Sequence, residues 1–136
     1  MKIVINGCYG GFGISHEGML EYARIKGIEL YPEKDSFGFY SYWIVPKENR
    51  PAKIDFRNVT QAERIAYNKA HSECTIYERD IPRDDPALIQ LVEVFGETAN
   101  GNFAELKVVE IPDGTDWQIG EYDGTEWVEE THQTWS

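Results

Sequence analysis

The first 27 residues alternate apolar and polar segments in a way that predicts a strand, a loop and a helix. Ile3, Val4 and Ile5 form a short run of β-branched apolar side chains, which indicates a buried strand at residues 2–6. A glycine-rich loop follows at 7–13. Ser15 stands at an expected N-cap with Glu17 in the first turn, and Gly27 fits the C-terminal stop, so a helix is predicted between them.

The middle of the chain predicts strands and one helix. β-Branched and aromatic residues indicate strands at 28–31 and 37–45, and apolar side chains on both faces of the second imply that both faces are covered. A further short strand is predicted at 54–57. Thr60 and Glu63 form a capping box, which places a helix start at about residue 61. The apolar stripe of this helix comprises Ala62, Ile65, Ala66, Lys69 and Ala70.

The last third begins with a strand predicted at 74–78 and then a third helix. Asp85 fits the cap of this helix and Pro86 its first position. Gly101 is the expected end. The apolar positions are spaced i, i+3, i+4, i+7 and i+11 and comprise Leu88, Leu91, Val92, Phe95 and Ala99. This spacing is typical of a helix with one buried face.

The C-terminal strands are predicted at 105–111, 117–122 and 125–130, as antiparallel neighbours. Asp123-Gly124 fits a hairpin turn between the last two. A two-residue turn places Glu121 opposite Glu126, whereas a three-residue turn shifts the register by one, and the pattern allows both. The fold class is therefore α+β, with a single mixed or antiparallel sheet, about three helices and a C-terminal β-hairpin.

Composition narrows the class of protein. The 136 residues fit a single α+β domain spanning 1–136, and 41% hydrophobic with 13% aromatic residues exclude a disordered chain. No apolar run approaches the roughly 18–20 residues of a membrane span, and the N-terminus lacks the apolar segment of a secretory signal. We therefore expect a cytoplasmic protein. Cys8 and Cys74 are expected to be reduced, although the sequence does not exclude one bridge.

The net charge of −11 argues against direct nucleic-acid binding, which requires a basic surface. Eight acidic residues and no Lys or Arg follow Lys107. Four aromatic residues are interspersed with these acids, namely Trp117, Tyr122, Trp127 and Trp135. They fit a protein–protein interface with aromatic anchors, a homo-oligomer contact, or a core face whose opposite side is kept in water by the acids.

The glycine-rich loop is the leading candidate site. A strand end, four glycines and a helix N-terminus can aim backbone amides at a phosphate, carboxylate or nucleotide. The spacing matches neither GxxxxGK[ST] nor GxGxxG, and a tight turn plugged by Tyr9 and Phe12 is the alternative. The candidate ligand-binding residues are Asn6, Cys8, Tyr9, Gly10, Gly11, Phe12, Gly13, Ser15 and His16.

Catalytic and metal-binding patterns are weaker. Cys8 precedes a helix start, where a thiol can become nucleophilic, but Ile14 occupies the position of the arginine in a phosphatase-like CxxxxxR. The histidines, His16, His71 and His132, lack metal-ligand spacing, so no metal or cofactor is predicted. The aspartates of the segment RDIPRDDP are expected to lie in a solvated loop with their arginines.

Four segments of the chain form a recognisable set: KIVIN..CYGGFGIS at 2–15, IPRDDP at 81–86, LKVVEIP at 106–112, and EYDGTEW at 121–127 with a terminal H-x-T-W. Through these segments the chain resembles a family of small, poorly characterised proteins encoded by phages, prophages and some bacteria. The resemblance implies a phage accessory protein in the host cytoplasm, where such proteins inhibit host proteins or sequester host signals as a form of counter-defence. It implies no catalytic residues.

Three functions remain open from the sequence. The first is an accessory protein that sequesters a small anionic or nucleotide-like ligand at the glycine-rich loop, with an immune-signal sponge as a specific case. The second is an acidic inhibitor that binds a host protein through its tryptophan-bearing tail. The third is an enzyme with Cys8 as nucleophile, which lacks convincing catalytic partners in the sequence.

Overall fold

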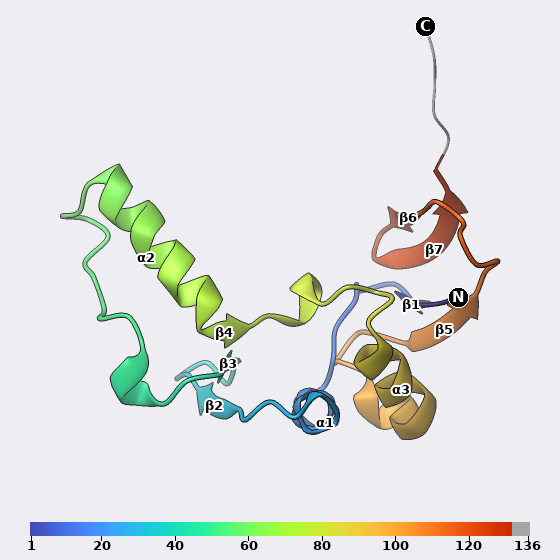
Figure 1. The fold of residues 1–136 in the computed structure, drawn as a ribbon, viewed down its shortest axis with the longest axis horizontal. Coiled ribbons are helices and arrows are strands. Elements are labelled where there is room, and N and C mark those ends of the chain that lie inside the picture. The colour runs from blue at the N-terminus through green and yellow to red at the C-terminus, as the bar shows by residue number, and fades with distance from the viewer. Residues whose placement is uncertain (132–136) are drawn as a thin grey trace, which may run out of the picture. The chain divides into compact units, whose positions relative to one another are not determined.

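The structure is a computed structural model that describes residues 1–131. The chain forms two compact units (Figure 1). Unit 1 consists of Met1–Gly27 and Glu78–Ser136, and unit 2 consists of Ile28–Tyr77. Three α-helices and a set of antiparallel strand pairs confirm the α+β class. Within the described residues, no helix is long and apolar enough to cross a membrane.

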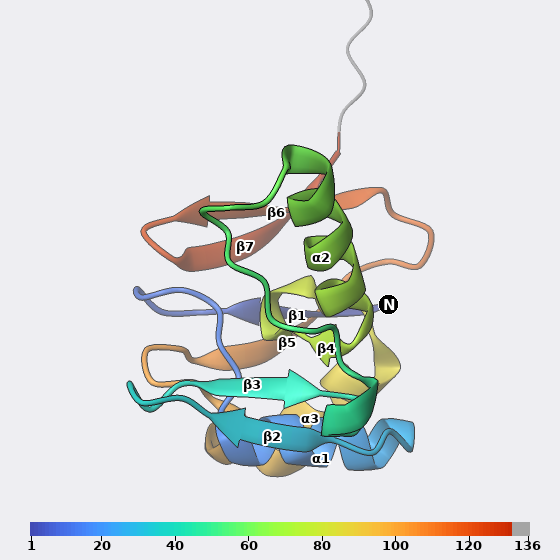
Figure 2. The ribbon, with the colours of Figure 1, turned by 90° about the vertical axis from the view of Figure 1, so that its left-hand side faces the viewer.

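Unit 1 is built around two antiparallel strands, β1 (Lys2–Asn6) and β5 (Leu106–Glu110). Helices α1 (His16–Lys26) and α3 (Pro86–Phe95) lie on one side of this pair, and the C-terminal hairpin lies on the other (Figures 1 and 2). Strand β1 therefore forms the middle layer of the unit, which explains why its sequence is continuously apolar.

The core of unit 1 follows from this layering. Residues 3–6 of β1 are at most 3% exposed, since one face meets the helices and the other the hairpin. The helices contribute the next group of buried apolar side chains: Met19, Tyr22, Ala23, Leu88, Leu91 and Val92. The apolar run at 3–5 and the spacing of Leu88, Leu91 and Val92 predicted these buried positions, whereas Phe95 of the same predicted stripe is half-buried.

The helix starts of unit 1 agree with the capping residues. Ser15 caps α1 by accepting a hydrogen bond from the Gly18 amide at 2.9 Å. Asp85 caps α3, and Pro86 occupies its first turn. The predicted end of α3 is wrong, because the helix stops at Phe95. Gly96 then adopts a positive φ and opens a 3₁₀ turn, Gly96–Ala99, that keeps Ala99 buried.

The C-terminal hairpin comprises β6 (Trp117–Tyr122) and β7 (Thr125–Glu130), as predicted. The turn is the two-residue form, with positive φ at both Asp123 and Gly124, so Glu121 lies opposite Glu126. The expectation that β5 pairs with this hairpin is wrong, since β5 pairs with β1. The strands are divided among three small sheets, not gathered into one.

Unit 2 contains an antiparallel sheet of β2 (Tyr31–Lys34), β3 (Tyr40–Trp43) and β4 (Thr75–Ile76). It also contains helix α2 (Gln61–Glu73), which begins at the predicted capping box. A 3₁₀ turn spans Lys47–Asn49. Strand β2 begins where the predicted strand 28–31 ended, and the strand predicted at 54–57 does not form. Residues 55–58 instead form a turn closed by the Asn58 N–H and the Asp55 carbonyl, 3.0 Å apart.

The burial predicted for unit 2 is wrong. None of residues 28–77 is buried, and Phe37 and Phe39, on the turn before β3, are 84% and 73% exposed. The stripe predicted on α2 is also exposed, with Ile65 at 60%. The apolar pattern of unit 2 therefore formed strands and a helix without a buried core of their own.

Candidate functional site

The glycine-rich loop is fixed to the hairpin and to β5 by Asn6. This side chain is fully buried. Its amide nitrogen donates to the carbonyl oxygens of Cys8 and Gly124, both at 2.7 Å, and its side-chain oxygen accepts from the Glu105 amide at 2.8 Å. Asn6 thus joins three segments that lie far apart in the sequence. Its role is to position the loop, since all of its polar atoms are already used.

Two glycines of the loop have different roles. Gly10 has φ +117°, and a Cβ there would lie 2.6 Å from the Cβ of Phe103, so only glycine fits. A Cβ on Gly11 would meet only the guanidinium of Arg79, at 3.8 Å. Gly10 also donates its amide to the Asp123 carbonyl at 3.2 Å. The backbone at Gly10 and Gly11 is therefore packed against Gly124 of the hairpin turn, where an added Cβ would lie 2.7 and 2.2 Å from their amide nitrogens, while the Cβ side of Gly11 is open toward Arg79.

The helix end of the loop is bound by the protein's own oxygens. The Ile14 amide donates to Oε2 of Glu78 at 2.8 Å. The Ser15 hydroxyl caps α1 and donates to the Thr98 carbonyl at 2.5 Å. A carboxylate and a hydroxyl thus occupy the positions in which an anion at this helix start was expected.

Cys8, Tyr9 and His16 do not line the cavity at this loop, whereas Phe12 does. The Cys8 thiol donates to the Phe103 carbonyl at 3.1 Å and lies 3.6 Å from the Asn6 side-chain oxygen. Tyr9 is 70% exposed, so it does not plug the turn, whereas Phe12 is 6% exposed and does. His16 is the first residue of α1. Both cysteines are free.

A cavity of about 430 Å³ lies between the loop and the hairpin turn of unit 1. The short 3₁₀ turn Glu78–Asp80 and the segment after it supply its arginines. The lining residues are Gly10, Gly11, Phe12, Arg79, Arg83, Glu121, Asp123, Gly124 and Glu126. Of the nine sequence candidates, only Gly10, Gly11 and Phe12 reach this cavity.

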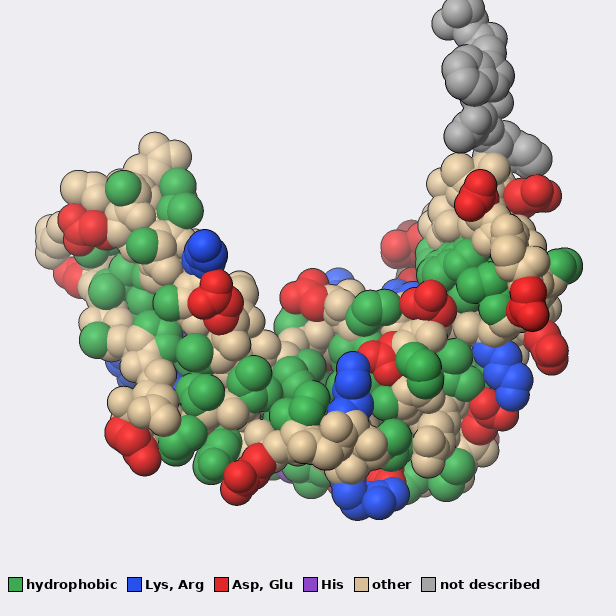
Figure 3. All heavy atoms as spheres, in the orientation of Figure 1, with side chains coloured by type: hydrophobic (Ala, Val, Ile, Leu, Met, Phe, Trp, Pro, Cys, Tyr) green, Lys and Arg blue, Asp and Glu red, His purple; other side chains and the backbone are tan. Residues whose placement is uncertain are grey.

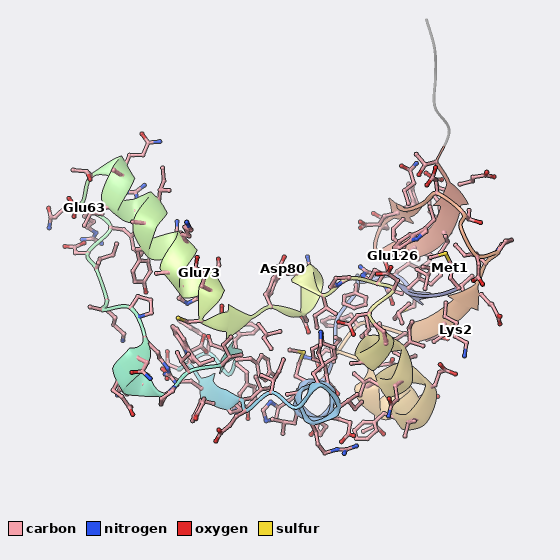
Figure 4. All side chains as sticks on the ribbon, in the orientation of Figure 1. Met1, Lys2, Glu63, Glu73, Asp80 and Glu126 are labelled. Atoms are coloured by element: carbon pink, nitrogen blue, oxygen red, sulfur yellow. The ribbon has the colours of Figure 1, made fainter. Side chains whose placement is uncertain are left out.

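A buried ion pair forms the floor of the cavity. Arg83 donates to both carboxylate oxygens of Glu126, at 2.6 and 2.9 Å, and the two side chains are 16% and 6% exposed. The guanidinium also stacks on the ring of Phe12, 3.7 Å from its centroid. Glu126 in turn accepts the Asn6 amide of β1 at 2.8 Å (Figure 4 labels Glu126). This pair is rigid and internally neutralised.

The remaining charges of the cavity are not neutralised by such contacts. Arg79, Glu121 and Asp123 are all exposed, and within residues 1–131 their side chains make no ion pair. The cavity therefore presents one cationic group and two carboxylates beside the open face of Gly11. Such a set can bind an anionic group through the arginine and hydroxyl or amino groups through the carboxylates.

A second polar cluster supports the fold beside α1 and α3. Asp85 accepts from the Tyr22 hydroxyl at 2.8 Å and from the Lys26 ammonium at 2.9 Å, in addition to its cap on α3. Burial raises the pKa of the Asp85 carboxyl, but the hydrogen bonds from Lys26, Tyr22 and the Ala87 amide outweigh it and hold that pKa below its ordinary value. The hydrogen bond to Asp85 raises the pKa of Lys26.

Sequence reasoning missed the charged half of the cavity. The arginines were assigned to a solvated loop with their neighbouring aspartates, yet Arg83 pairs with Glu126, 43 positions away. The signal available was the pair Arg79 and Arg83, two of the six basic residues among the 17 acids of unit 1. A basic residue among many acids is a candidate either for an ion pair inside the fold, as Arg83 forms, or for binding an anionic group.

Comparison of the chain with family models, curated proteins and solved structures finds no match.

Three of the four aromatic residues predicted in the acidic tail lie in the hairpin, namely Trp117, Tyr122 and Trp127. Tyr122 is 69% exposed and Trp127 is 43% exposed. Trp135 and His132 lie outside the described residues. Residues 1–131 contain no group of His, Cys, Asp or Glu side chains arranged to hold a metal ion.

Proposed function

We propose that this protein binds a small polar ligand in the cavity between the glycine-rich loop and the hairpin turn. The ligand class is one that carries both an anionic group and hydroxyl groups, as nucleotides and sugar phosphates do. The single observation that carries the proposal is the exposed guanidinium of Arg79 facing the open side of Gly11, next to Glu121 and Asp123. The protein acts by sequestering this ligand.

The charges of the cavity favour a mixed ligand over a simple anion. Arg83 is already paired with Glu126, so Arg79 is the remaining cation, while Glu121 and Asp123 repel an isolated phosphate. A phosphate attached to a sugar satisfies both groups, because carboxylates accept hydrogen bonds from sugar hydroxyls. The close packing of Gly10 and Gly124 fixes the loop before the ligand arrives, which reduces the entropy lost on binding.

Sequestration fits the chemistry of the loop better than catalysis does. The Cys8 sulfur contacts are a carbonyl oxygen and an amide oxygen, and neither can accept the thiol proton as a general base. Cys8 also does not line the cavity. In the phage setting implied by the sequence resemblance, such a protein would act in the host cytoplasm by lowering the free concentration of a host signal, a counter-defence role.

Isothermal titration calorimetry of the full chain tests this function. The panel comprises nucleoside mono- and diphosphates, cyclic dinucleotides, ribose 5-phosphate and inorganic phosphate. We expect at least one sugar-bearing phosphate to bind, and Arg79→Ala to weaken that binding at least tenfold because it removes a charged hydrogen bond worth about 1.5–3 kcal/mol. Glu121→Gln preserves the shape of the side chain and should weaken binding severalfold.

Arg24→Ala is the matched control. Arg24 is a 71% exposed arginine of unit 1 that pairs with Glu21 on the surface of α1 and does not line the cavity. Its removal changes the net charge by the same amount and should leave binding unchanged. If no compound of the panel binds, or if Arg79→Ala binds as tightly as the wild type, this function is wrong.

A further inference from the structure

The C-terminal hairpin has one face that does not line the cavity. Side chains alternate between the two faces of a strand, so the face that contains Glu121 and Glu126 lies toward the cavity and β1. The opposite face carries two exposed aromatic side chains, Tyr122 at 69% and Trp127 at 43%. The remaining residues of this face are Gln118, Gly120, Thr125 and Glu129. We call these six residues the outer hairpin face.

The indole of Trp127 is held in place by its neighbours on this face. It covers Gly120, the residue opposite it on β6, so closely that a Cβ on that glycine would overlap the Nε1 and Cε2 atoms of the ring. The indole N–H donates to Oε2 of Glu129 at 2.9 Å, and Oε1 of the same carboxylate accepts from Gln118 at 2.7 Å. The ring is therefore oriented before a partner arrives, which reduces the entropy lost on binding.

The hairpin is also strongly acidic. Residues 117–130 contain no Lys or Arg and five carboxylates, which belong to Glu121, Asp123, Glu126, Glu129 and Glu130. Arg83 pairs with Glu126, and this single cation does not balance the five anions. In Figure 3, carboxylates lie around the apolar side chains over β6 and β7. Each strand is only about 20 Å long, so these charges attract a cation that approaches Trp127.

We propose that the outer hairpin face binds an arginine-bearing segment of a partner protein, with the guanidinium stacked on the Trp127 indole. The face of a tryptophan ring attracts a cation more strongly than the other aromatic side chains do. A guanidinium is planar, so it stacks on the ring while its N–H groups still donate hydrogen bonds. Glu129 adds its negative charge beside the ring, and Tyr122 offers a second ring near the hairpin turn.

Charge selects this partner over the other ligands of an exposed tryptophan. A nucleobase also stacks on an indole, but its phosphates would be repelled by the carboxylates of the hairpin. A neutral sugar gains nothing from the negative charge, whereas an arginine gains from both the ring and the charge. Tryptophan, tyrosine and arginine are also the residues that contribute most to protein–protein binding. This binding is independent of the cavity ligand, because the cavity lies on the other face of the hairpin.

Isothermal titration calorimetry of the full chain with three probes tests the proposal. The probes are a heptapeptide in which three arginines alternate with glycines, the same peptide with citrulline in place of arginine, and the neutral sugar maltotriose. We expect the arginine peptide to bind. The citrulline peptide, which has the same shape without the charge, should bind at least about tenfold more weakly. If citrulline peptide or maltotriose binds as tightly as the arginine peptide, the face recognises another partner and the proposal is wrong.

Two substitutions separate the ring from the charge. Trp127→Leu removes the ring at constant charge and should weaken binding of the arginine peptide about fivefold, whereas Trp127→Phe keeps a ring and should retain most of the affinity. Glu129→Gln removes one charge, keeps an oxygen that can accept the indole N–H, and should weaken binding about threefold. Both side chains are exposed, so these variants should retain the wild-type circular dichroism spectrum.

Phe103→Leu is the matched control. Phe103 is 74% exposed in unit 1 and lies outside the hairpin, so an exposed aromatic ring is again replaced by leucine without a change in charge. This variant should bind the arginine peptide as the wild type does. An arginine peptide that does not bind the wild type, or that binds Trp127→Leu as tightly as the wild type, would overturn the proposal.

Discussion

The two units of this chain use the same local devices and reach different degrees of burial. Each contains a capped helix, an antiparallel strand pair and an arginine–glutamate pair. In unit 1 the pair Arg83–Glu126 is 16% and 6% exposed, whereas in unit 2 the pair Arg50–Glu33 is 12% and 58% exposed, so the two pairs differ in the burial of the glutamate. The comparison shows that capping boxes and strand patterns specify elements, while burial depends on whether a second layer lies against them.

The location of the aromatic residues gives the same contrast. In unit 1 the ring of Phe12 is 6% exposed beneath Arg83, and Tyr22 on α1 is 3% exposed. In unit 2 Trp43 is held between the Arg50 guanidinium and the His71 ring and remains partly exposed. Ring contacts at the surface hold side chains in place, but they remove little apolar area from water.

The largest expected difference between the units concerns their arginine–glutamate pairs. Glu126→Ala leaves Arg83 without its partner in a buried position and should lower the free energy of unfolding by about 3–5 kcal/mol. Glu33→Ala removes the 58% exposed partner of Arg50, which keeps its contact with the Trp43 ring and its hydrogen bond to the Val45 carbonyl, and should cost about 1 kcal/mol or less. Urea denaturation followed by circular dichroism measures both. Equal losses would contradict the difference in burial.

The next effect depends on pH. Asp85→Asn removes the charge that Tyr22 and Lys26 bind in unit 1, and should cost about 1.5–3 kcal/mol at pH 7. Because the folded pKa of Asp85 is lowered, its contribution is complete above the unfolded value of about 3.9 and is lost as pH falls through the lower folded value.

The difference between wild type and this variant should therefore disappear in the acid range and persist from pH 5 to 8. Asp55→Asn, in an exposed turn of unit 2, is the comparison and should cost about 0.5 kcal/mol or less at pH 7. Denaturation midpoints at several pH values decide the question. A cost for Asp85→Asn that stays constant down to pH 2 would assign the effect to the shape of the side chain, not to its charge.

The smallest effect compares the two helix caps. Ser15 caps α1 and also donates to the Thr98 carbonyl, so Ser15→Ala should cost about 1–2 kcal/mol. Thr60 caps α2 at an exposed position, and Thr60→Ala should cost about 0.5 kcal/mol. Thermal unfolding followed at 222 nm measures both. A larger loss for Thr60→Ala would show that α2 contributes more to stability than its exposure implies.

Local sequence signals were sufficient for the elements and much of unit 1. The N-caps Ser15, Thr60 and Asp85 and the strands 117–122 and 125–130 were predicted at the observed positions, because each depends on neighbours within four residues or on a single turn. The end of α3 was wrong. Gly96 adopts a positive φ and begins a 3₁₀ turn that keeps Ala99 in the core, and no short-range pattern distinguishes that turn from a continuing helix.

The sequence predicted the glycines that line the candidate site but not the charged residues that line it. The glycines of segment 7–13 predicted a tight loop. The structure agrees, because only glycine fits the backbone at Gly10. Arg79, Arg83 and Glu126 lie 68, 71 and 120 positions from their partners Gly11, Phe12 and Asn6. Their roles depend on which side chains the layers of unit 1 bring together. From the sequence, the two arginines were assigned to a solvated loop and Glu126 to an acidic tail.

By itself, therefore, the sequence determined the α+β class, the positions of the helices and the two-strand hairpin, because propensity, capping and turn chemistry act over a few residues. Only the tertiary structure decided that β1 pairs with β5, that Asn6 and Glu126 fix the loop, and that unit 2 stays unburied. These outcomes depend on which apolar faces meet. The hydrophobic effect is not directional, so an apolar stripe in the sequence does not identify the surface that will cover it.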